Sequence, residues 1–544
     1  MAQNKTYLLL AALLLLYILS VLVNFGVLEL AGEEPRRAVI SLEMMQSGNY
    51  ISPTLLGWDY YNKPPLYNWI ICASFFIFNS TSEFAIRFPS LVFYLLWALV
   101  HYFVCKKFFS RSIALLSSFF LLTSADIFFY GLANGGEIDI FYSFIVYLQA
   151  VSIFYFYVKK RWFLLFFFSY LFCSIGFLTK GFTSIAFEVL TLAALCFYDR
   201  SFRVLFKWQH LVGIFAFLAL TGFYFFLYNQ HGTSQRLLVN LLNESLIKSA
   251  VGERSDKLLS KSLGYPLLFL KLFAPWSLLL LLLLKKIRYK FFDNPLVAFS
   301  LLFIVFNIWV YWFTGQPKGR YIYMFVPFAC VVLVHIYQQF ATAFLVQLNR
   351  ILGYAGWVFF LVLAAIIATP FFIPVSLLWT VVLAIILAVF IYGYLQLDAY
   401  RIWLLITGII LTRLVYAVLF IPVEYDKKYK FSPGIQQAAI NNNLQPLTLW
   451  APADTFTVAV KNKLIDWKLE QTFIAPVLSY QVSYYYFKYT GHLIRFDTTS
   501  KPNNNYISFS SDLKARPGKE FIDTNYVFDH PRQNDTLVFY YLKK

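Results

Sequence analysis

The chain has 544 residues, of which 60% are hydrophobic and only 13% are charged. A soluble protein carries about 25% charged residues, so this composition excludes a soluble enzyme and a secreted disulfide scaffold. The net charge of +18 (45 basic minus 27 acidic residues) therefore calls for a membrane explanation before a nucleic-acid-binding one.

Apolar segments long enough to cross a membrane recur from Tyr7 to Pro422. The first, residues 7–28, lacks a small-residue cleavage site and is too long for a signal-peptide core, so we expect a retained span. Twelve more spans are expected at 84–105, 112–131, 138–157, 162–179, 182–198, 209–228, 264–284, 295–313, 321–340, 351–369, 375–396 and 402–421. Leu66–Phe78 is too short to cross comfortably and is expected to lie at the interface. The sequence thus predicts an all-α polytopic membrane protein with about 13 transmembrane helices.

The basic residues indicate the orientation of these spans. If the N-terminus is cytoplasmic, the inner loops carry sixteen basic residues and three acids, whereas the rest of residues 1–423 is nearly balanced. This bias is the one that the positive-inside rule requires. We therefore expect an inner (plasma) membrane protein whose tail, after an odd number of crossings, lies in the periplasm of a Gram-negative cell.

The tail is more polar than the rest of the chain. Residues 424–544 contain no span and are rich in Asn and charged residues, so we divide the chain into a transmembrane domain, 1–423, with outer loops 29–65 and 229–263, and a soluble domain, 424–544. A short helix is expected at 434–442, with strands at 447–451 and 506–510 and a closing hairpin of 526–529 and 536–542. These elements predict a small extracytoplasmic α/β domain.

Several kinds of site are not indicated. All five cysteines lie in apolar segments, which favours small core residues over disulfides or cysteine-bound metal. There is no nucleotide-binding glycine loop, and Pro517-Gly518-Lys519 lacks the upstream glycine and following Ser/Thr of a phosphate loop.

The outer side carries the polar groups suited to chemistry. Loop 29–65 begins with Glu33 and Glu34 near the end of the first span and later places Lys63 among aromatic residues and prolines. Acids at that position also suit a helix N-terminus, and a lysine there also suits snorkelling, so structural interpretations remain open for both.

A second group of charges follows along the outer side. Asp139 begins the fourth expected span and enters the membrane boundary, where a carboxylate is costly and is a functional candidate by default. The other outer charges of this group are Lys180, Glu244, Lys318 and Arg320. Carboxylates and cations together suit transfer of a group from a phosphorylated lipid carrier, because cations stabilise the departing phosphate and a carboxylate deprotonates an incoming hydroxyl.

Three ionisable residues lie deeper in the apolar segments: Asp126, Glu188 and Arg413. Buried pairing is the simpler explanation, but deep acids also occur in proton-coupled transporters. A transporter or flippase of lipid-linked sugars therefore remains an alternative from another functional class, although related halves with matching broken spans are absent from the sequence.

At these residues the chain resembles the polyprenyl-phosphate-dependent glycosyltransferases of the GT-C superfamily, particularly the aminoarabinose lipid A transferases, which are related to the protein O-mannosyltransferases. The motifs that carry the resemblance are Glu33-Glu34-Pro35-Arg36-Arg37-Ala38, Tyr61-Asn62-Lys63-Pro64, Arg87, Asp139, Thr179-Lys180-Gly181, Ala274-Pro275-Trp276-Ser277 and Lys318-Gly319-Arg320-Tyr321. They span about residues 1–340.

The resemblance implies roles for individual residues. Glu33 and Asp139 would be the active-site acids, with Glu34 as the alternative to Glu33. The donor phosphate would be bound by Lys63, Arg320, Lys318 and Arg36, and other substrate groups by Tyr61, Asn62, Lys180 and Glu244. Neither a nucleotide sugar nor an obligatory metal or other cofactor is implied. Asn62 replaces a glutamate of the family motif and Ser245 an expected histidine, which leaves the identity of the sugar open.

The resulting hypothesis is a membrane glycosyltransferase that moves a sugar from an undecaprenyl-phosphate-type donor to lipid A or another envelope lipid or glycoconjugate, with inversion. Glu33 or Asp139 would be the general base for a hydroxyl acceptor, whereas a phosphate acceptor would need none. A protein O-glycosyltransferase and a catalytically dead envelope scaffold are the further alternatives. No nucleic-acid partner is expected, and the oligomeric state is left open.

Overall fold

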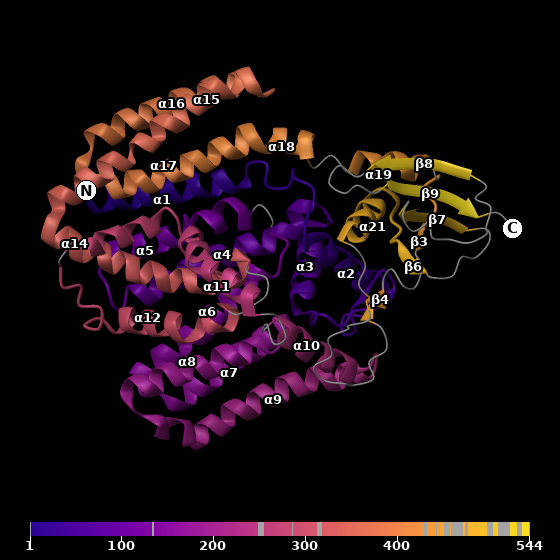
Figure 1. Cartoon of the computed structure of the whole chain (residues 1–544), viewed down its shortest axis with the longest axis horizontal. Helices are drawn as coiled ribbons and strands as arrows, with labels where there is room; N and C mark the ends of the chain where they lie inside the picture. The colour runs from indigo at the N-terminus through magenta and orange to yellow at the C-terminus, as the bar shows by residue number, and fades with distance from the viewer. Residues whose placement is uncertain are drawn as a thin grey trace.

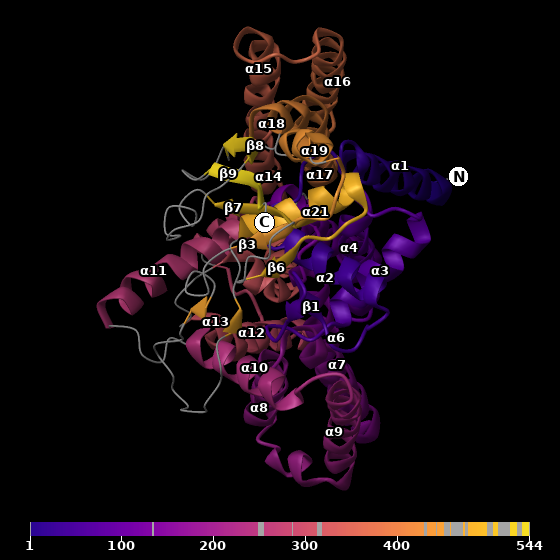
Figure 2. The same ribbon diagram turned by 90° about the vertical axis from the view of Figure 1, so that its right-hand side faces the viewer.

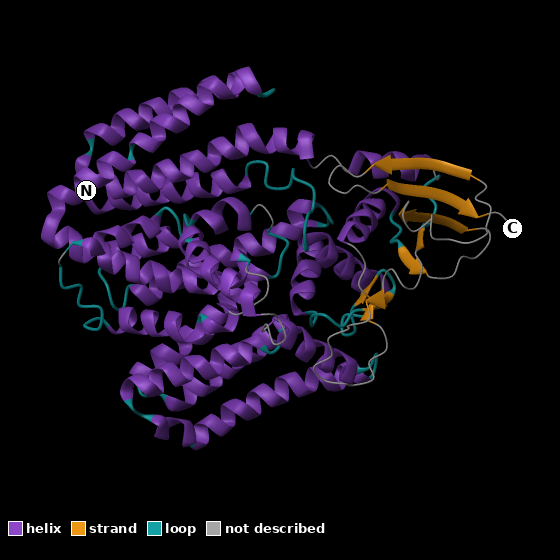
Figure 3. Ribbon diagram, in the orientation of Figure 1, coloured by secondary structure: helices purple, strands orange, loops and turns teal. Residues whose placement is uncertain are grey.

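The structure is a computed structural model, and it is mostly helical (Figure 1). It describes residues 2–132, 135–248, 255–285, 287–312, 318–428, 432–441, 443–450, 457–458, 472–473, 477–497, 504–509, 523–529 and 536–542. Most of the helices run roughly side by side in one body, and the strands gather beside one end of it (Figures 1 and 3).

The N-terminal half contains these helices: α1 (Ala2–Leu22), α2 (Glu34–Ser47), α3 (Leu66–Phe78), α4 (Glu83–Cys105), α5 (Arg111–Leu122), η1 (Asp126–Gly131), α6 (Asp139–Val158), α7 (Trp162–Lys180), α8 (Thr183–Asp199), η2 (Phe202–Phe206), α9 (Trp208–Asn229), α10 (Ser234–Lys248) and α11 (Ser255–Leu272). The remaining helices are η3 (Trp276–Leu284), α12 (Pro295–Asn307), α13 (Trp309–Trp312), η4 (Gly319–Phe325), α14 (Val326–Ala355), α15 (Trp357–Phe372), α16 (Leu377–Gln396), η5 (Asp398–Tyr400), α17 (Arg401–Val415), η6 (Tyr416–Phe420), α18 (Ile421–Lys428), α19 (Ser432–Asn441) and α21 (Val477–Thr490).

Within the described residues, eight helical segments are long and apolar enough to cross a membrane, or nine if a bent pair counts as one span. The chain is therefore a multi-pass membrane protein. One of the eight segments, Gly319–Phe372, covers two of the expected spans. The helices at three further expected positions, α1, α5 and α8, have shorter apolar stretches or fewer residues. The count of 13 remains a prediction.

One expected span is not straight. Residues 264–284 were expected as a single helix, but α11 and η3 meet there at an angle of 114°. Pro275 lies at the break, and proline lacks the backbone N–H that would continue the helical hydrogen bonds.

Helix α6 is the central helix of the body. Its most apolar window is 72% buried, compared with 22% for α9, and it packs against α4, α7, α8 and η4. The residue at its N-terminal end, Asp139, is therefore held inside the protein at one end of the helical body.

The C-terminal strands form a five-stranded sheet in the order β6-β3-β7-β9-β8. Their bounds are β3 (Thr448–Trp450), β6 (Arg495–Asp497), β7 (Asn504–Phe509), β8 (Asp523–Asp529) and β9 (Thr536–Leu542); β1 (Thr54–Leu55) pairs with β2 (Trp58–Asp59), and β4 (Thr457–Val458) with β5 (Thr472–Phe473). β3 is parallel to β6 and β7, whereas β9 is antiparallel to β7 and β8. The expected short helix, strands and closing hairpin are present, while α21, β4, β5 and β6 were not predicted.

The C-terminal elements pack on the first outer loop. α21 lies against α2, and both contribute to one apolar cluster with α3 and α19 (Figure 2). The backbone N–H of Leu30 donates to the Tyr485 hydroxyl at 2.9 Å, and that of Phe496 donates to the carbonyl of Leu56 at 2.9 Å. These contacts hold the start of α2, and with it the two adjacent glutamates, against the C-terminal elements.

Candidate active site

Four charged side chains meet at the N-terminal end of α6: Glu137, Asp139, Lys180 and Arg320. Lys180 Nζ lies 2.5 Å from Asp139 Oδ1, and Arg320 Nε lies 3.5 Å from Asp139 Oδ2. Arg320 Nη1 also forms an ion pair with Glu137 Oε1. The side chains are at most 11% exposed, so these charges interact in a low-dielectric environment, where each interaction is stronger than in water.

Tyrosine rings surround the Lys180 ammonium. Its Nζ lies 4.6 Å from the ring centre of Tyr321, 4.9 Å from that of Tyr142 and 5.9 Å from that of Tyr311. Aromatic faces stabilise a desolvated cation. The three helices α6, α13 and η4 thereby hold Lys180 in place beside Asp139.

Glu137 was not predicted as a site residue. It follows Gly135-Gly136. The pKa of its carboxyl is raised to about 8, chiefly by burial and then by the neighbouring charge of Asp139, while Arg320 acts in the opposite direction. Its position two residues before Asp139 in one glycine-containing loop was the available signal in the sequence.

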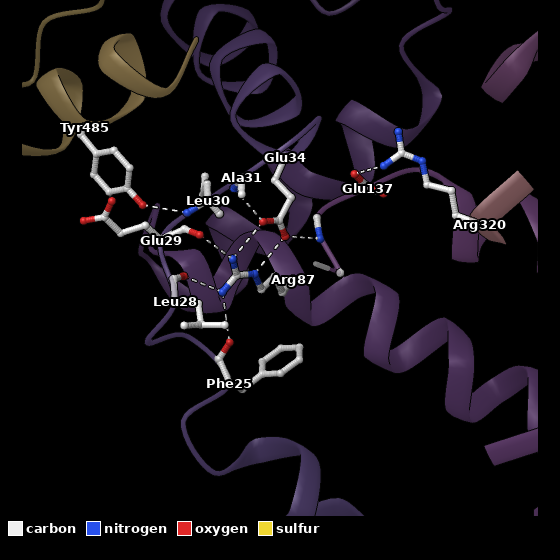
Figure 4. A network of polar contacts seen from close by, with 12 residues as sticks. Phe25, Leu28, Glu29, Leu30, Ala31, Glu34, Arg87, Glu137, Arg320 and Tyr485 are labelled. Carbon is white, nitrogen blue, oxygen red and sulfur yellow. Dashed lines mark hydrogen bonds and ion pairs between the residues drawn. The ribbon is translucent and has the colours of Figure 1, made fainter. Parts of the chain in front are cut away.

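Glu34 has a different environment, shown beside the Glu137–Arg320 pair in Figure 4. Both of its oxygens accept hydrogen bonds of 2.9 Å from Arg87, and they also accept from the backbone N–H groups of Gly136 and Ala31. Arg87 donates further to three backbone oxygens, those of Phe25, Leu28 and Glu29. Glu34 is fully buried. This bonding ties the first outer loop to α4 and leaves the carboxylate no accessible oxygen.

Glu33 is the more accessible of the two adjacent acids. It precedes α2, its side chain is 31% exposed, and it pairs with Arg36 at 2.8 Å. The Arg36 guanidinium lies 5.0 Å from the ring centre of Tyr480 in α21. Between the two candidates named from the sequence, the geometry favours Glu33 as the acid available to a substrate.

Lys63 is held in place by a residue of α10. It is 9% exposed, and its ammonium forms an ion pair with Glu244 of α10. The structure therefore brings together two residues that were predicted on separate outer loops.

The residues before Lys63 are also fixed by α10. Asn240 donates to the Asn62 side-chain oxygen at 3.0 Å and to the Tyr61 carbonyl at 3.0 Å. The Tyr61 hydroxyl donates to Asp59 at 2.9 Å. The amide of Asn62 thus has a neutral partner at the position where the related motif has a glutamate.

Helix α10 connects the Lys63 group to the Lys180 group. A Cβ built on Gly181 would lie 3.4 Å from Leu241, so α10 packs directly on the residue after Lys180. Glu244 follows Leu241 by three residues, on the same side of the helix. The two cations therefore face a common region bordered by α10.

Two further charged residues lie next to Arg320 in the structure or in the chain. Lys318 is exposed at the start of η4. Asp126, which was expected deep in a span, accepts a hydrogen bond of 2.9 Å from Tyr323 and lies 3.0 Å from a Cβ built on Gly319. Asp126 therefore borders the Arg320 segment. In the part of the chain that the structure describes, no three Asp, Glu, His or Cys side chains are arranged to hold a metal ion.

Comparisons with known proteins show which family and which fold the chain resembles. Residues 62–225 match the family model described as dolichyl-phosphate-mannose-protein mannosyltransferase. The solved structure of ArnT from Cupriavidus metallidurans superposes with a TM-score of 0.65 at 15% identity, covering 99% of this chain and 98% of that one. The chain has the fold of ArnT. The resemblance to GT-C polyprenyl-phosphate-dependent glycosyltransferases seen in the sequence is thereby confirmed.

Relatives found by sequence are also glycosyltransferases, and they match a shorter part of the chain. The undecaprenyl phosphate-alpha-4-amino-4-deoxy-L-arabinose arabinosyl transferase 2 of Proteus mirabilis is 32% identical over 174 residues, which is 31% of each chain. The corresponding transferase of Aeromonas hydrophila is 30% identical over 177 residues, again 31% of each chain. The match thus spans about a third of the length of these relatives. A second structure of the Cupriavidus protein, at 14% identity, contains undecaprenyl phosphate.

Proposed function

We propose that this protein is a membrane glycosyltransferase that takes a sugar from an undecaprenyl-phosphate-type donor and passes it, with inversion, to lipid A or another envelope acceptor. The observation that carries the proposal is the buried group of Asp139, Lys180, Arg320 and Glu137, with Lys63 nearby in an ion pair with Glu244 of α10. Fixed cations in a water-poor site suit a reaction in which negative charge develops on a departing phosphate.

The bond changes assign a role to each group. The acceptor oxygen attacks the anomeric carbon while the bond from that carbon to the donor phosphate oxygen breaks, and the phosphate leaves on its lipid. Arg320 and Lys63 would stabilise the charge of the leaving phosphate, with Arg36 and Lys318 as outer cations. Lys180 would orient Asp139 rather than touch the phosphate, because the two side chains are 2.5 Å apart.

The base assignment follows from accessibility. For a hydroxyl acceptor, Glu33 is the better base, because its side chain is 31% exposed whereas Asp139 faces Lys180 and Arg320. For a phosphate acceptor no base is required. Tyr61, Asn62 and Glu244 would border the sugar or the acceptor.

The proposed topology supplies the membrane setting. We propose thirteen spans, a cytoplasmic N-terminus and an inner-membrane location, with residues 1–423 as the transmembrane domain and 424–544 as a periplasmic domain. The positive bias of the inner loops supports this orientation. It places the start of α6 and the first outer loop on the periplasmic side. No cofactor is required by this mechanism.

A protein acceptor is the second candidate. It is favoured by the family model that matches residues 62–225, which describes protein mannosyltransferases. The two candidates differ in where the sugar appears, on an envelope lipid or on Ser and Thr side chains.

Mass spectrometry of envelope lipids and glycoproteins, from cells with and without the protein, tests the proposal. Transfer is supported if a sugar-sized mass disappears from one class of envelope molecule in cells without the protein and in cells with Lys63→Ala. The same mass should be retained in cells with Lys290→Ala. The molecule that carries the mass identifies the acceptor class. Lys290 is a suitable control because it is an exposed lysine in a loop that the proposed topology assigns to the inner side. Accumulation of lipid-linked sugar on the inner leaflet, without any missing product, would instead indicate a flippase.

A further inference from the structure

The guanidinium of Arg320 is paired with carboxylates and keeps one donor without a hydrogen bond to any described residue. Its Nη1 pairs with Glu137, its Nε lies 3.5 Å from Asp139, and this Nε makes no hydrogen bond within the described residues. A guanidinium presents several N–H donors in a planar fork that matches carboxylate and phosphate oxygens equally. A lipid phosphate arriving at Arg320 must therefore compete with Glu137.

The charges around Glu137 show why its carboxylate and a lipid phosphate cannot both bind Arg320 as anions. The groups that face it from neighbouring elements are Arg320, Asp139, Glu34, Tyr130 and Tyr323. Of the nearby cations, Arg87 is committed to Glu34 and Lys180 to Asp139. The donor phosphodiester brings a charge of about −1 and the released lipid phosphomonoester a charge of about −2, so binding of either at Arg320 leaves an uncompensated carboxylate in a buried site.

Glu137 is the carboxylate least committed to other partners. Glu34 accepts four hydrogen bonds, and Asp139 pairs with both Lys180 and Arg320. Among the described residues, Glu137 has Arg320 as its one ion-pair partner. Removing Arg320 from Glu137 thus costs fewer interactions than removing it from the other acids.

We propose that Glu137 is a positioning residue that occupies Arg320 until the lipid phosphate displaces it, and that Glu137, where it is ionised, takes up a proton when this happens. This inference rests on the proposed function, because it takes a lipid phosphate as the ligand of Arg320. The proton comes from solvent, and the transferred sugar and the broken bond are those already described.

Two features keep the free-energy cost of replacing Glu137 by a phosphate at Arg320 low. Burial and Asp139 raise the pKa of Glu137 to about 8, so protonation near neutral pH requires little free energy. The backbone stays in place, because the N–H of Gly136 donates to Glu34 at 2.9 Å and a Cβ at Gly136 would lie 2.7 Å from Ile86. The change is therefore a rotation of the Glu137 side chain.

The inference predicts a pH dependence of lipid-phosphate affinity. If only the protonated form of Glu137 releases Arg320, a pKa of about 8 makes the dissociation constant rise about tenfold from pH 7 to pH 9. The second ionisation of the phosphate lies near pH 6 and that of lysine near 10.4, so neither accounts for a change centred at pH 8. Binding at pH 9 should take up about 0.9 proton per lipid.

The experiment is calorimetric titration of the full-length protein in detergent with undecaprenyl phosphate, at pH 7 and pH 9, in buffers of different ionisation enthalpy. We expect Glu137→Gln to bind with a dissociation constant that differs less than twofold between the two pH values and with no comparable proton uptake. At pH 9 it should bind about tenfold more tightly than the wild type. Glu244→Gln is the matched control, since it removes a carboxylate from Lys63, and it should retain the pH dependence.

The possible results separate the two proposals. Equal pH dependence in wild type and Glu137→Gln, weaker binding by Glu137→Gln at both pH values, or loss of the pH dependence in Glu244→Gln would overturn the role of Glu137. If Glu137→Gln does not fold, the wild-type proton uptake decides, and a value near zero at pH 9 rejects the exchange. Absence of undecaprenyl phosphate binding by a folded wild-type protein at both pH values would instead reject the proposed donor.

Discussion

Arg87 and Arg320 each pair with a glutamate in the same region of the molecule, yet their surroundings differ (Figure 4). Arg87 and Glu34 are at most 1% exposed, and the guanidinium also donates to three backbone carbonyls. The side chain of Arg320 is 11% exposed, it is shared between Glu137 and Asp139, and its Nε has no hydrogen-bond partner in the described part of the chain. An arginine whose donors are all hydrogen-bonded, such as Arg87, fixes the backbone around it. An arginine with a donor that no described residue uses, such as Arg320, can still bind a ligand.

Arg87→Leu should have the largest effect on stability. It would leave the buried Glu34 carboxyl without its guanidinium partner and three backbone carbonyls without their donor, so we expect a loss of about 3–5 kcal/mol in the free energy of unfolding. Thermal unfolding in detergent measures it. The comparison fails if Arg87→Leu unfolds at the wild-type temperature.

Arg320→Gln should lower the transfer rate strongly and the stability only moderately. Under the proposed mechanism, losing this cation should lower the transfer rate by about 100- to 1000-fold, as loss of a charge-stabilising donor does in other enzymes. The stability loss should be less than half that of Arg87→Leu, because Glu137 can be protonated and Asp139 keeps Lys180. A fully active Arg320→Gln protein would exclude Arg320 from the reaction.

Lys63→Ala should have an intermediate effect. Its ammonium pairs with Glu244, whose side chain is 28% exposed, so the site is less enclosed than the one around Arg320. We expect kcat/KM for the lipid-linked donor to fall about 10- to 100-fold, measured in detergent with Lys290→Ala as the control. Equal activity of the two variants would place donor binding elsewhere.

Lys488→Ala should have the smallest effect. This residue of α21 pairs with Glu83 at 2.7 Å, but its side chain is 34% exposed, and exposed ion pairs contribute about 0–1 kcal/mol. Unfolding temperature and transfer rate should both stay near the wild-type values. A large loss of transfer with unchanged stability would show that the position of α21 matters to the site.

Helix ends were predicted well where apolar runs are bounded by charges. α3, α4, α6 and α7 begin and end within one residue of the predicted limits because polar residues at the interface end each apolar segment. The bend between α11 and η3 was missed, since a proline marks where a helix can break and not the direction it then takes. α21 was missed because its tyrosine-rich sequence is not a strong helix former, and its packing against α2 stabilises it.

The site was predicted in part. Asp139, Lys180 and Arg320 were named from the sequence as outer-side charges, and the structure joins them in ion pairs. Glu137 was overlooked because its burial and its pairing with Arg320 depend on η4, nearly 200 residues later in the chain. The sequence also left Glu33 and Glu34 equivalent.

The sequence by itself determined the membrane class, the apolar helices and the types of charge available on one side, because hydropathy and residue type are local properties. Only the tertiary structure decided which charges meet. Glu33 and Glu34 are adjacent in the chain, but successive residues of a helix face different directions. One therefore enters the saturated contact with Arg87, and the other remains accessible beside Arg36.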